Sequence, residues 1–200
     1  ATLVGQCLTD HEGEFEVYKD RADRVQVALD YLASKEKNSA ILPELKVNPG
    51  KYLYRDDWWG TADIVMIMHN ENGNYASSLE SIEVSDYKGG SMPVSPFDND
   101  QGISYMLGAL HHASTLGLII SPEMPVSFSI IQPKCGGVSQ PWTVTAGELL
   151  NVYLPAMAEG IAACESPDPK FVPGDEQCQW CKHKRDCKAR SDWALREVNL

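Results

Sequence analysis

Two apolar segments separated by a polar turn constrain the fold of this chain most strongly. Residues 62–69 (ADIVMIMH) form a short apolar run that predicts a buried strand. Residues 79–88 (LESIEVSDYK) alternate in part between apolar and polar and predict a second strand. The sequence between them includes Asn-Glu-Asn-Gly-Asn at 70–74, which is typical of a turn. The chain therefore predicts a β-hairpin with a long loop.

This hairpin would place two aspartates at the same end of the sheet. In an antiparallel pair, the start of the first strand lies beside the end of the second, and Asp63 and Asp86 occupy these two positions. Lys88 follows Asp86 by two residues and so shares its face of the strand. Close carboxylates repel each other when ionised, and a divalent cation removes that cost. A few oxygen ligands with room for water suit Mg²⁺ or Mn²⁺. A lysine beside them suits metal-assisted phosphodiester hydrolysis.

The rest of the chain predicts a mixed α/β domain. Apolar residues recur with helical spacing over 22–35 and 100–117, and residues 126–131 predict a third core strand. Residues 145–148 (TAGE) fit a capping box at the start of a further helix. Pro155 lies inside that helix and should kink it. The order of these elements does not fit a doubly wound sheet.

The net charge excludes one class of nucleic-acid-binding protein. The 200-residue chain carries a formal charge of −11 at pH 7, whereas a simple cationic coat protein neutralises phosphates with lysine and arginine. A nucleic-acid enzyme with a local basic patch or bound metal ions remains possible. No apolar run approaches about 18 residues, and no basic segment precedes an apolar one. We therefore expect no membrane span and no secretory signal.

Three cysteines near the C-terminus have close spacing. Of the six cysteines in the chain, Cys178, Cys181 and Cys187 form the pattern C-x2-C-x5-C. Nothing else in the sequence indicates secretion, so this spacing favours a metal or cluster site over a disulfide framework. Thiolates bind both Zn²⁺ and iron–sulfur clusters, and spacing alone does not decide between them.

Four motifs, taken in order, resemble the PD-(D/E)XK nuclease superfamily. They are Gly60-Thr61-Ala62-Asp63, Val84-Ser85-Asp86-Tyr87-Lys88-Gly89-Gly90, Gln101-x3-Tyr105 and the three cysteines. The resemblance covers about residues 22–190. It is closest to the RecB/Cas4-like branch and, within it, to the phage-associated family DUF2800. It implies an α/β fold with a PD-(D/E)XK (restriction-endonuclease-like) core, a mixed central sheet flanked by helices, over residues 1–172. A cysteine-rich and basic element of the same domain would follow at 173–200.

The resemblance also implies roles for individual residues. Asp63 and Asp86 correspond to the acidic metal ligands, and the backbone carbonyl of Tyr87 to a further ligand. Lys88 corresponds to the catalytic lysine. The two residues of the helical motif would contact the metal's waters or the DNA, and their i, i+4 spacing puts them on one helix face; they are Gln101 and Tyr105. The basic residues expected to contact the DNA backbone are Lys182, Lys184, Arg185, Lys188 and Arg190.

The histidine ligand that is usual in this branch has more than one candidate position in this chain. The branch usually carries a metal-binding histidine on an N-terminal helix, and His11 lies in surroundings typical of a loop. In the alternative, which we favour, residues 1–8 continue a helix that follows a histidine absent from this chain. Glu44 is a further acidic candidate.

The fourth ligand of the proposed cysteine cluster also has alternative candidates. In relatives that hold a [4Fe-4S] cluster, three C-terminal cysteines join one cysteine far upstream. Cys7 is available for that role, and Cys164 and His183 are local substitutes. The family favours [4Fe-4S], with Zn²⁺ as the alternative.

The resemblance implies a Mg²⁺- or Mn²⁺-dependent deoxyribonuclease, and we expect an exonuclease. It would act in DNA processing or recombination in the cytoplasm of a bacterial or phage-infected cell. Its partners would be DNA, as single strands or duplex ends, and recombination or phage replication proteins. The missing or displaced histidine favours an alternative, a catalytically impaired or non-catalytic DNA-binding or recombination-partner module on the same fold. In a third hypothesis, the chain is a structural zinc protein whose acidic pair and lysine are incidental.

Overall fold

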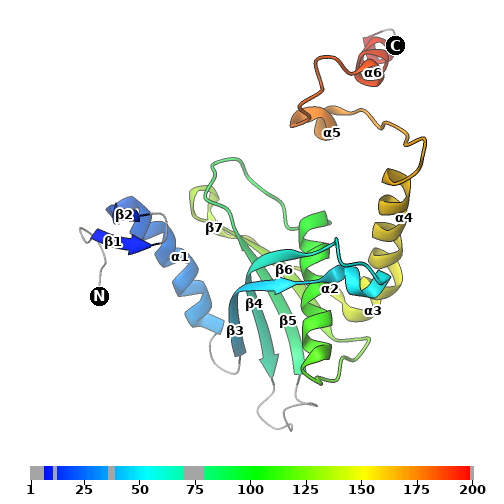
Figure 1. Cartoon of the computed structure of the whole chain (residues 1–200). Helices are drawn as coiled ribbons and strands as arrows, with labels where there is room; N and C mark the ends of the chain where they lie inside the picture. The colour runs from blue at the N-terminus through cyan, green and yellow to red at the C-terminus, as the bar shows by residue number, and fades with distance from the viewer. Residues whose placement is uncertain (1–6, 11–12, 36–38, 70–78, 199–200) are drawn as a thin grey trace. The chain divides into compact units, whose positions relative to one another are not determined.

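A six-stranded mixed sheet organises the first part of the chain (Figure 1). The computed structural model describes residues 7–10, 13–35, 39–69 and 79–198. The strand order is β3-β4-β5-β6-β7, and β8 also pairs with β6. β5 and β6 are parallel, and the other pairs in the sheet are antiparallel. The strands are β3 (Ser39–Val47), β4 (Gly60–His69), β5 (Leu79–Tyr87), β6 (Pro125–Gln132), β7 (Gly137–Val138) and β8 (Trp142–Thr145).

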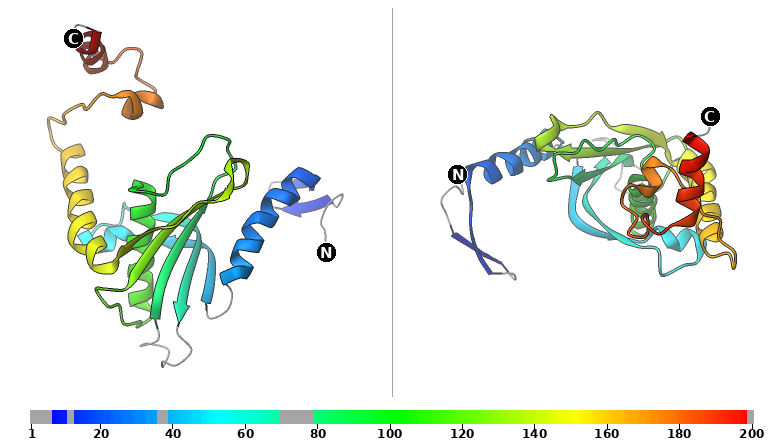
Figure 2. Two further views of the ribbon diagram at one scale, coloured as in Figure 1. Left: turned by 180° about the vertical axis from the view of Figure 1, so that it is seen from behind. Right: turned by 90° about the horizontal axis from the view of Figure 1, so that it is seen from above.

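Two helices cover opposite faces of this sheet, α1 (Lys19–Lys35) and α2 (Asp100–Thr115) (Figures 1 and 2). On the α1 face, Val27 and Leu32 pack against a buried cluster that includes Ile64 and Ile131. Two short 3-10 helices, η1 (Pro49–Leu53) and η2 (Pro133–Cys135), follow β3 and β6. The expectation of a mixed α/β fold with a mixed sheet flanked by helices is confirmed.

Glycines allow α2 to lie close to the sheet. A Cβ atom on Gly102 would lie 2.4 Å from the ring of Phe128, and one on Gly108 would lie 2.5 Å from the Val47 side chain. Larger side chains at these helix positions would push α2 away from β6 and β3. The first of these contacts lies in the first turn of α2, so it sets how closely the start of the helix approaches the sheet.

β4 and β5 form the predicted hairpin. Their ladder runs from Ile64 opposite Ser85 to Met68 opposite Ser81, and its register shifts between Met68 and His69. The predicted strands 62–69 and 79–88 therefore match β4 and β5 to within two residues. The predicted turn at 70–74 lies outside the described residues.

The other predicted elements also form. The helix predicted at 22–35 begins slightly earlier, the helix predicted at 100–117 ends slightly earlier, and the strand predicted at 126–131 is β6. One expectation about the N-terminal end is wrong for the residues described there. Cys7 and Leu8 belong to a strand, β1 (Cys7–Asp10), which pairs with β2 (Gly13–Glu16), and not to the end of a helix.

The helix predicted after Thr145 begins with the expected capping box. Thr145 and Glu148 exchange their side-chain and backbone hydrogen bonds at the start of α3 (Ala146–Glu148). A π-helical segment, η3 (Leu149–Tyr153), then leads into α4 (Leu154–Cys164). Pro155 has no N–H and its ring clashes with the carbonyl four residues earlier in a regular α-helix. The π turn lies directly before Pro155, at the place where the proline disturbs a regular α-helix.

Residues Ala156–Leu200 form a second compact unit, separate from Ala1–Pro155. This unit contains most of α4, then α5 (Asp175–Gln179) and α6 (Lys188–Val198). The expected boundary between residues 172 and 173 falls inside this unit. Among the described residues, the helices are too short or too polar to cross a membrane.

Candidate functional site

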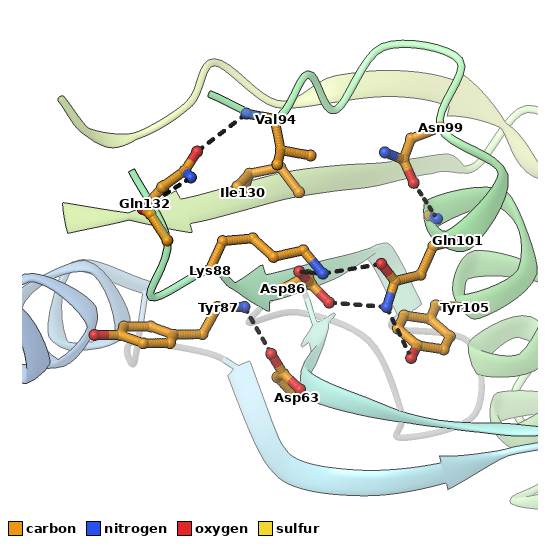
Figure 3. Close-up of polar contacts among 12 residues, drawn as sticks. Asp63, Asp86, Tyr87, Lys88, Val94, Asn99, Gln101, Tyr105, Ile130 and Gln132 are labelled. Carbon is orange, nitrogen blue, oxygen red and sulfur yellow. Dashed lines mark hydrogen bonds and ion pairs between the residues drawn. The ribbon is translucent and has the colours of Figure 1, made fainter. Parts of the chain in front are cut away.

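The two aspartates of the predicted hairpin lie side by side where β4 begins and β5 ends. The last ladder pair is Ile64 opposite Ser85, which makes Asp63 and Asp86 the next positions along the two strands. Ile64 faces α1, so the alternation of a strand turns Asp63 toward α2. The backbone N–H of Tyr87 donates to Asp63 Oδ2 at 2.7 Å (Figure 3). The strands therefore bring both carboxylates to one face and one end of the sheet.

Asp86 is the most deeply buried charged residue of this group, with 2% of its surface exposed. Its Oδ2 lies 2.7 Å from Lys88 Nζ, and its Oδ1 accepts a hydrogen bond from Gln101 Nε2 at 3.2 Å. Burial raises the pKa of Asp86 above its ordinary value, Lys88 lowers it, and the charge of Asp63 raises it. The net increase in pKa means that the nearby lysine does not fully compensate the buried carboxylate. A cation at this carboxylate would stabilise its ionised form.

Lys88 connects the acidic pair to α2. Its Nζ contacts Asp86 and also donates to Gln101 Oε1 at 3.0 Å. Its backbone N–H donates to the carbonyl of Ile131 at 2.8 Å, which continues the contact between β5 and β6 beyond the last residue of β5. The half-buried lysine is thus held at its backbone by the parallel strand and at its ammonium group by two side chains.

Gln101 and Tyr105 project from the first turns of α2 toward these residues, as Figure 3 shows. Gln101 Nε2 donates to the Tyr105 hydroxyl at 3.0 Å as well as to Asp86. Asn99 caps the helix, since its Oδ1 accepts from the backbone N–H of Gly102 at 3.0 Å. A Cβ atom on Gly60 would lie 2.8 Å from the Tyr105 ring, so this glycine lets the ring approach the start of β4. The structure therefore joins Gln101 and Tyr105 to the acidic pair.

Tyr87 contributes to the site through its backbone. Its side chain lies on the opposite face of the sheet, where it packs against the cluster under α1, and Figure 3 shows its ring directed away from Asp86. Its N–H is the group that holds Asp63. The backbone carbonyl of the same residue directly follows Asp86 in the sequence and is the further ligand candidate.

Glu44, one of the additional metal-ligand candidates, is not joined to the acidic pair. Glu44 lies on the edge strand β3, where flanking pairs put it opposite Asp63, but its side chain is exposed and its φ angle is +50°. Throughout the described part of the chain, no group of three or more histidine, cysteine, aspartate or glutamate side chains is arranged to hold a metal ion. His11 lies outside the described residues.

The C-terminal cysteines lie in and between the short helices of the second unit. Cys178 belongs to α5, and Cys187 directly precedes α6; both are half-buried, whereas Cys181 is exposed. All three thiols are free, and in this part of the described chain they do not form a ready metal-binding group. Cys164 is exposed at the end of α4. Cys7 lies in β1.

The basic residues of the second unit differ in their surroundings. Lys184 Nζ donates to the Gln179 carbonyl at 2.9 Å, and Arg190 donates to the Lys184 carbonyl at 3.2 Å. Lys188 pairs with Asp192 at 2.5 Å. Four of the five are exposed, Lys182, Lys184, Arg185 and Lys188, and Arg190 is half-buried.

Sequence reasoning did not single out a buried polar network on the α1 face. Glu83 of β5 is 4% exposed and accepts hydrogen bonds from the Tyr31 hydroxyl and from Ser129 Oγ. Lys35 Nζ lies 3.0 Å from the other Glu83 oxygen. Ser129 Oγ also lies 2.7 Å from Ser85 Oγ. The available signal was a carboxylate between two apolar residues, Ile82 and Val84, in the middle of a predicted strand, because buried charges need partners.

A second polar residue that the sequence reasoning missed is Gln132 at the end of β6. It is 4% exposed and hydrogen bonds to the loop that follows Lys88. Its only sequence signal is a polar residue that ends an apolar strand, directly before Pro133.

Two comparisons relate this chain to known proteins. A solved structure described as "Crystal structure of SSO0001" is 13% identical, with a TM-score of 0.31, and the match covers 84% of this chain and 68% of that one. A likeness of this size carries no argument about function. A family model described as "Protein of unknown function (DUF2800)" matches residues 9–200, which include every residue of the site described above. This chain therefore belongs to the DUF2800 family.

Proposed function

We propose that this protein is a divalent-metal-dependent DNA nuclease of the exonuclease type, built on a PD-(D/E)XK core. The observation that carries the proposal is the convergence of Asp63, Asp86 and Lys88 on one face of the sheet, beneath the first turns of α2. A buried carboxylate beside a second carboxylate and a lysine suits metal-assisted phosphodiester hydrolysis.

The donor atoms at the site fit Mg²⁺ or Mn²⁺. Carboxylate and carbonyl oxygens are the ligands that these hard cations prefer. Asp86 is buried, and the pKa of its carboxyl is raised even though Lys88 lies beside it. Asp63, Asp86 and the backbone carbonyl of Tyr87 would hold the ion. When bound, such an ion lowers the pKa of a water and offsets the charge of a phosphate.

Lys88 has two functions in this proposal. Its ammonium lies 2.7 Å from Asp86 Oδ2 and offsets part of the negative charge there. Near a bound phosphodiester it would orient the attacking water or stabilise negative charge on the phosphate. Gln101 keeps this ammonium in place by accepting its hydrogen bond at 3.0 Å, and Tyr105 in turn holds the Gln101 amide.

The cysteines and basic residues extend the proposal to the second unit. Cys178, Cys181 and Cys187 would be ligands of a [4Fe-4S] cluster, with Zn²⁺ as the alternative. Metal analysis of the purified protein distinguishes the two, because a cluster brings iron and visible absorption and zinc brings neither. The exposed Lys182, Lys184, Arg185 and Lys188, together with the half-buried Arg190, would contact the DNA backbone.

A second candidate is a DNA-binding or recombination-partner module that has lost catalysis. The observation that favours it is the small ligand set. Among the described residues no third acidic or histidine side chain joins Asp63 and Asp86 as a ligand group, and Lys88 already pairs with Asp86. Such a protein would bind DNA without cleaving it.

The deciding experiment follows the fate of end-labelled linear single- and double-stranded DNA with Mg²⁺, Mn²⁺ or EDTA. We expect cleavage that requires the metal and disappears in Lys88→Ala. Lys51→Ala is the matched control, because Lys51 is an exposed lysine paired with Asp56, outside the site. The position of the label gives the polarity of degradation.

Each other result has a distinct meaning. Cleavage that survives Lys88→Ala would show that the active site lies elsewhere or that a contaminant cuts the DNA. DNA binding without cleavage by the parent protein would favour the second candidate. Neither binding nor cleavage would reject both proposals.

A further inference from the structure

A loop without helix or strand joins two residues of the site. It covers residues 89–99, directly after Lys88 and directly before α2, which carries Gln101. Lys88 Nζ and Gln101 Oε1 are 3.0 Å apart. Because the loop connects these two residues, its path determines where α2 starts relative to the end of β5. A change in the loop would therefore change the contact between lysine and glutamine.

Gln132 binds this loop from the sheet. Its Oε1 accepts a hydrogen bond from the backbone N–H of Val94 at 3.1 Å. Its Nε2 donates to the carbonyls of Gly90 at 3.2 Å and Met92 at 2.7 Å. Both ends of one buried amide thus bind three backbone groups at alternate loop positions. Figure 3 shows Gln132 and Val94 on the side of Lys88 away from Asp63.

The position of Gln132 follows from the parallel pairing of β5 and β6. Tyr87 lies opposite Ile131 in that ladder, so Gln132 is the next position after Ile131, as Lys88 is after Tyr87. Two parallel strands end at the same edge of a sheet. The residue that follows the β6 ladder therefore reaches the chain that leaves β5.

A second anchor holds the other end of the loop. Asn99 caps α2 through Gly102 and donates its side-chain amide to the Ser95 carbonyl at 3.1 Å. The Asn99 anchor lies on the loop itself and moves with it. Phe97 contacts Trp142 of β8 through its ring, at 5.9 Å between centroids. Gln132 ties the first half of the loop to the end of β6, beside the strand that ends with Asp86 and Tyr87.

We infer that Gln132 is a positioning residue for the proposed nuclease: by fixing the loop at residues 90, 92 and 94, it holds Gln101 against Lys88 and Asp86. This inference rests on the proposed function. An amide is required because the loop presents one donor and two acceptors. Glutamate would keep the acceptor but would face two carbonyls with a carboxylate, and methionine, of similar size, would make none of these hydrogen bonds.

The test compares Gln132→Met and Gln132→Glu with the full parent chain. Ser129→Ala is the matched control, because Ser129 is equally buried on the same strand but bonds to Glu83 and Ser85 on the opposite face. Steady-state cleavage of end-labelled DNA gives kcat and KM. Amide hydrogen exchange of Val94 and the side-chain amide resonance of Gln101 report the loop and the site without any requirement for cleavage.

We expect both Gln132 variants to lower kcat by up to about 100-fold, with KM close to that of the parent, because misplacing a catalytic group by about 1 Å can have an effect of this size. Val94 exchange should be slow in the parent and fast in the variants, and the Gln101 resonance should shift. Ser129→Ala should lose stability without these three changes.

Three outcomes would overturn the inference. They are rapid Val94 exchange in the parent, an unshifted Gln101 resonance in the Gln132 variants, and an equal loss of kcat in Ser129→Ala. If a Gln132 variant does not fold, exchange at Val94 in the parent still decides whether the loop is held. If the parent cleaves no DNA, the proposed function fails, whereas the exchange and resonance results still show whether Gln132 holds Gln101 against Lys88.

Discussion

The backbone N–H of Tyr87 donates to Asp63 Oδ2 at 2.7 Å, across two strands that have reached the end of their ladder. This hydrogen bond holds one oxygen of Asp63 beside Tyr87, the residue that directly follows Asp86. The Tyr87 side chain packs on the opposite face, under α1. A residue whose ring packs under α1 on one face of the sheet therefore holds an acidic group on the other face through its backbone N–H.

Replacing Asp86 by asparagine should change how the stability of the protein depends on pH. The pKa of Asp86 is raised in the folded protein above its ordinary value of 3.8, mainly by burial. A raised carboxyl pKa contributes stability that is full below the unfolded pKa and is lost as the pH rises through the folded pKa. Asp86→Asn removes that loss. We expect urea unfolding to show the variant gaining stability relative to the parent as pH rises; a difference that is constant with pH would contradict this account.

The same variant tests the fit of a metal ion. A divalent cation bound by Asp63 and Asp86 would stabilise the folded parent by mass action. We expect added Mg²⁺ or Mn²⁺ to raise the Tm of the parent and to raise that of Asp86→Asn much less. Asp192→Asn is the control, because Asp192 is an exposed aspartate in a surface pair. An equal increase in Tm for parent and Asp86→Asn would show that the ion binds elsewhere.

Removing the Tyr31 hydroxyl should destabilise the protein without abolishing metal-dependent chemistry. Tyr31 donates to the buried Glu83, whose other oxygen pairs with Lys35. Glu83 keeps Ser129 and Lys35 as partners, so the variant loses one hydrogen bond to a charged group, which typically contributes about 1.5–3 kcal/mol. We expect Tyr31→Phe to lower the free energy of unfolding by that amount in chemical denaturation. Tyr54→Phe, at a 99% exposed position, should leave it unchanged, and equal effects of the two variants would argue against a buried network.

Adding one methyl group at Gly102 should affect both stability and the site. Its Cβ would lie 2.4 Å from the Phe128 ring, and overpacking of this kind costs about 1–3 kcal/mol. The displaced first turn of α2 would carry Gln101 away from Asp86. Nuclease activity should therefore fall even under conditions in which the variant is fully folded. Gly160→Ala is the control, because a Cβ there meets nothing within 4 Å and should stabilise α4 by roughly 0.5–1 kcal/mol. A stable, fully active Gly102→Ala would show that α2 can move without consequence.

The capping box at Thr145 offers a test of local structure. Thr145 accepts from the Glu148 N–H at 3.1 Å, and Glu148 accepts from the Thr145 N–H at 2.7 Å. Loss of such a cap costs about 0.5–2 kcal/mol. We expect Thr145→Ala and Glu148→Ala each to destabilise the protein, and the double variant to lose less than the sum. Strictly additive losses in denaturant unfolding would mean that the two side chains act independently.

The sequence predicts local features of this fold well and distant ones poorly. The β4–β5 hairpin and the pairing of Asp63 with Asp86 follow from alternation and strand length, which are readable over 25 neighbouring residues. The capping box at Thr145 is also a local pattern. In contrast, the edge strand β3 carries Pro43 and a positive φ at Glu44, so its sequence does not indicate the long strand that pairing with β4 stabilises.

The difference between local and distant contacts also explains which residues of the candidate site the sequence predicts. Asp86 and Lys88 lie on one strand, and Gln101 and Tyr105 share a helix face, so their spacing predicts each half of the site. Gln132 has no local pattern. Its role depends on the parallel pairing of β5 with β6, which joins residues about forty positions apart. Sequence spacing predicts the neighbouring β4–β5 hairpin but does not indicate which distant strand lies beside β5.

The parallel pairing also has a consequence for the order in which the site forms during folding. The β4–β5 hairpin joins neighbouring segments and can close early, with both carboxylates already at one end. The contact of β5 with β6 requires the whole crossover through α2, so its loop-closure entropy is larger. A folding intermediate that contains only the hairpin would hold two close carboxylates without Gln132 to place the loop. We therefore expect Asp63 and Asp86 to come together before β6 pairs with β5 and Gln132 binds the loop.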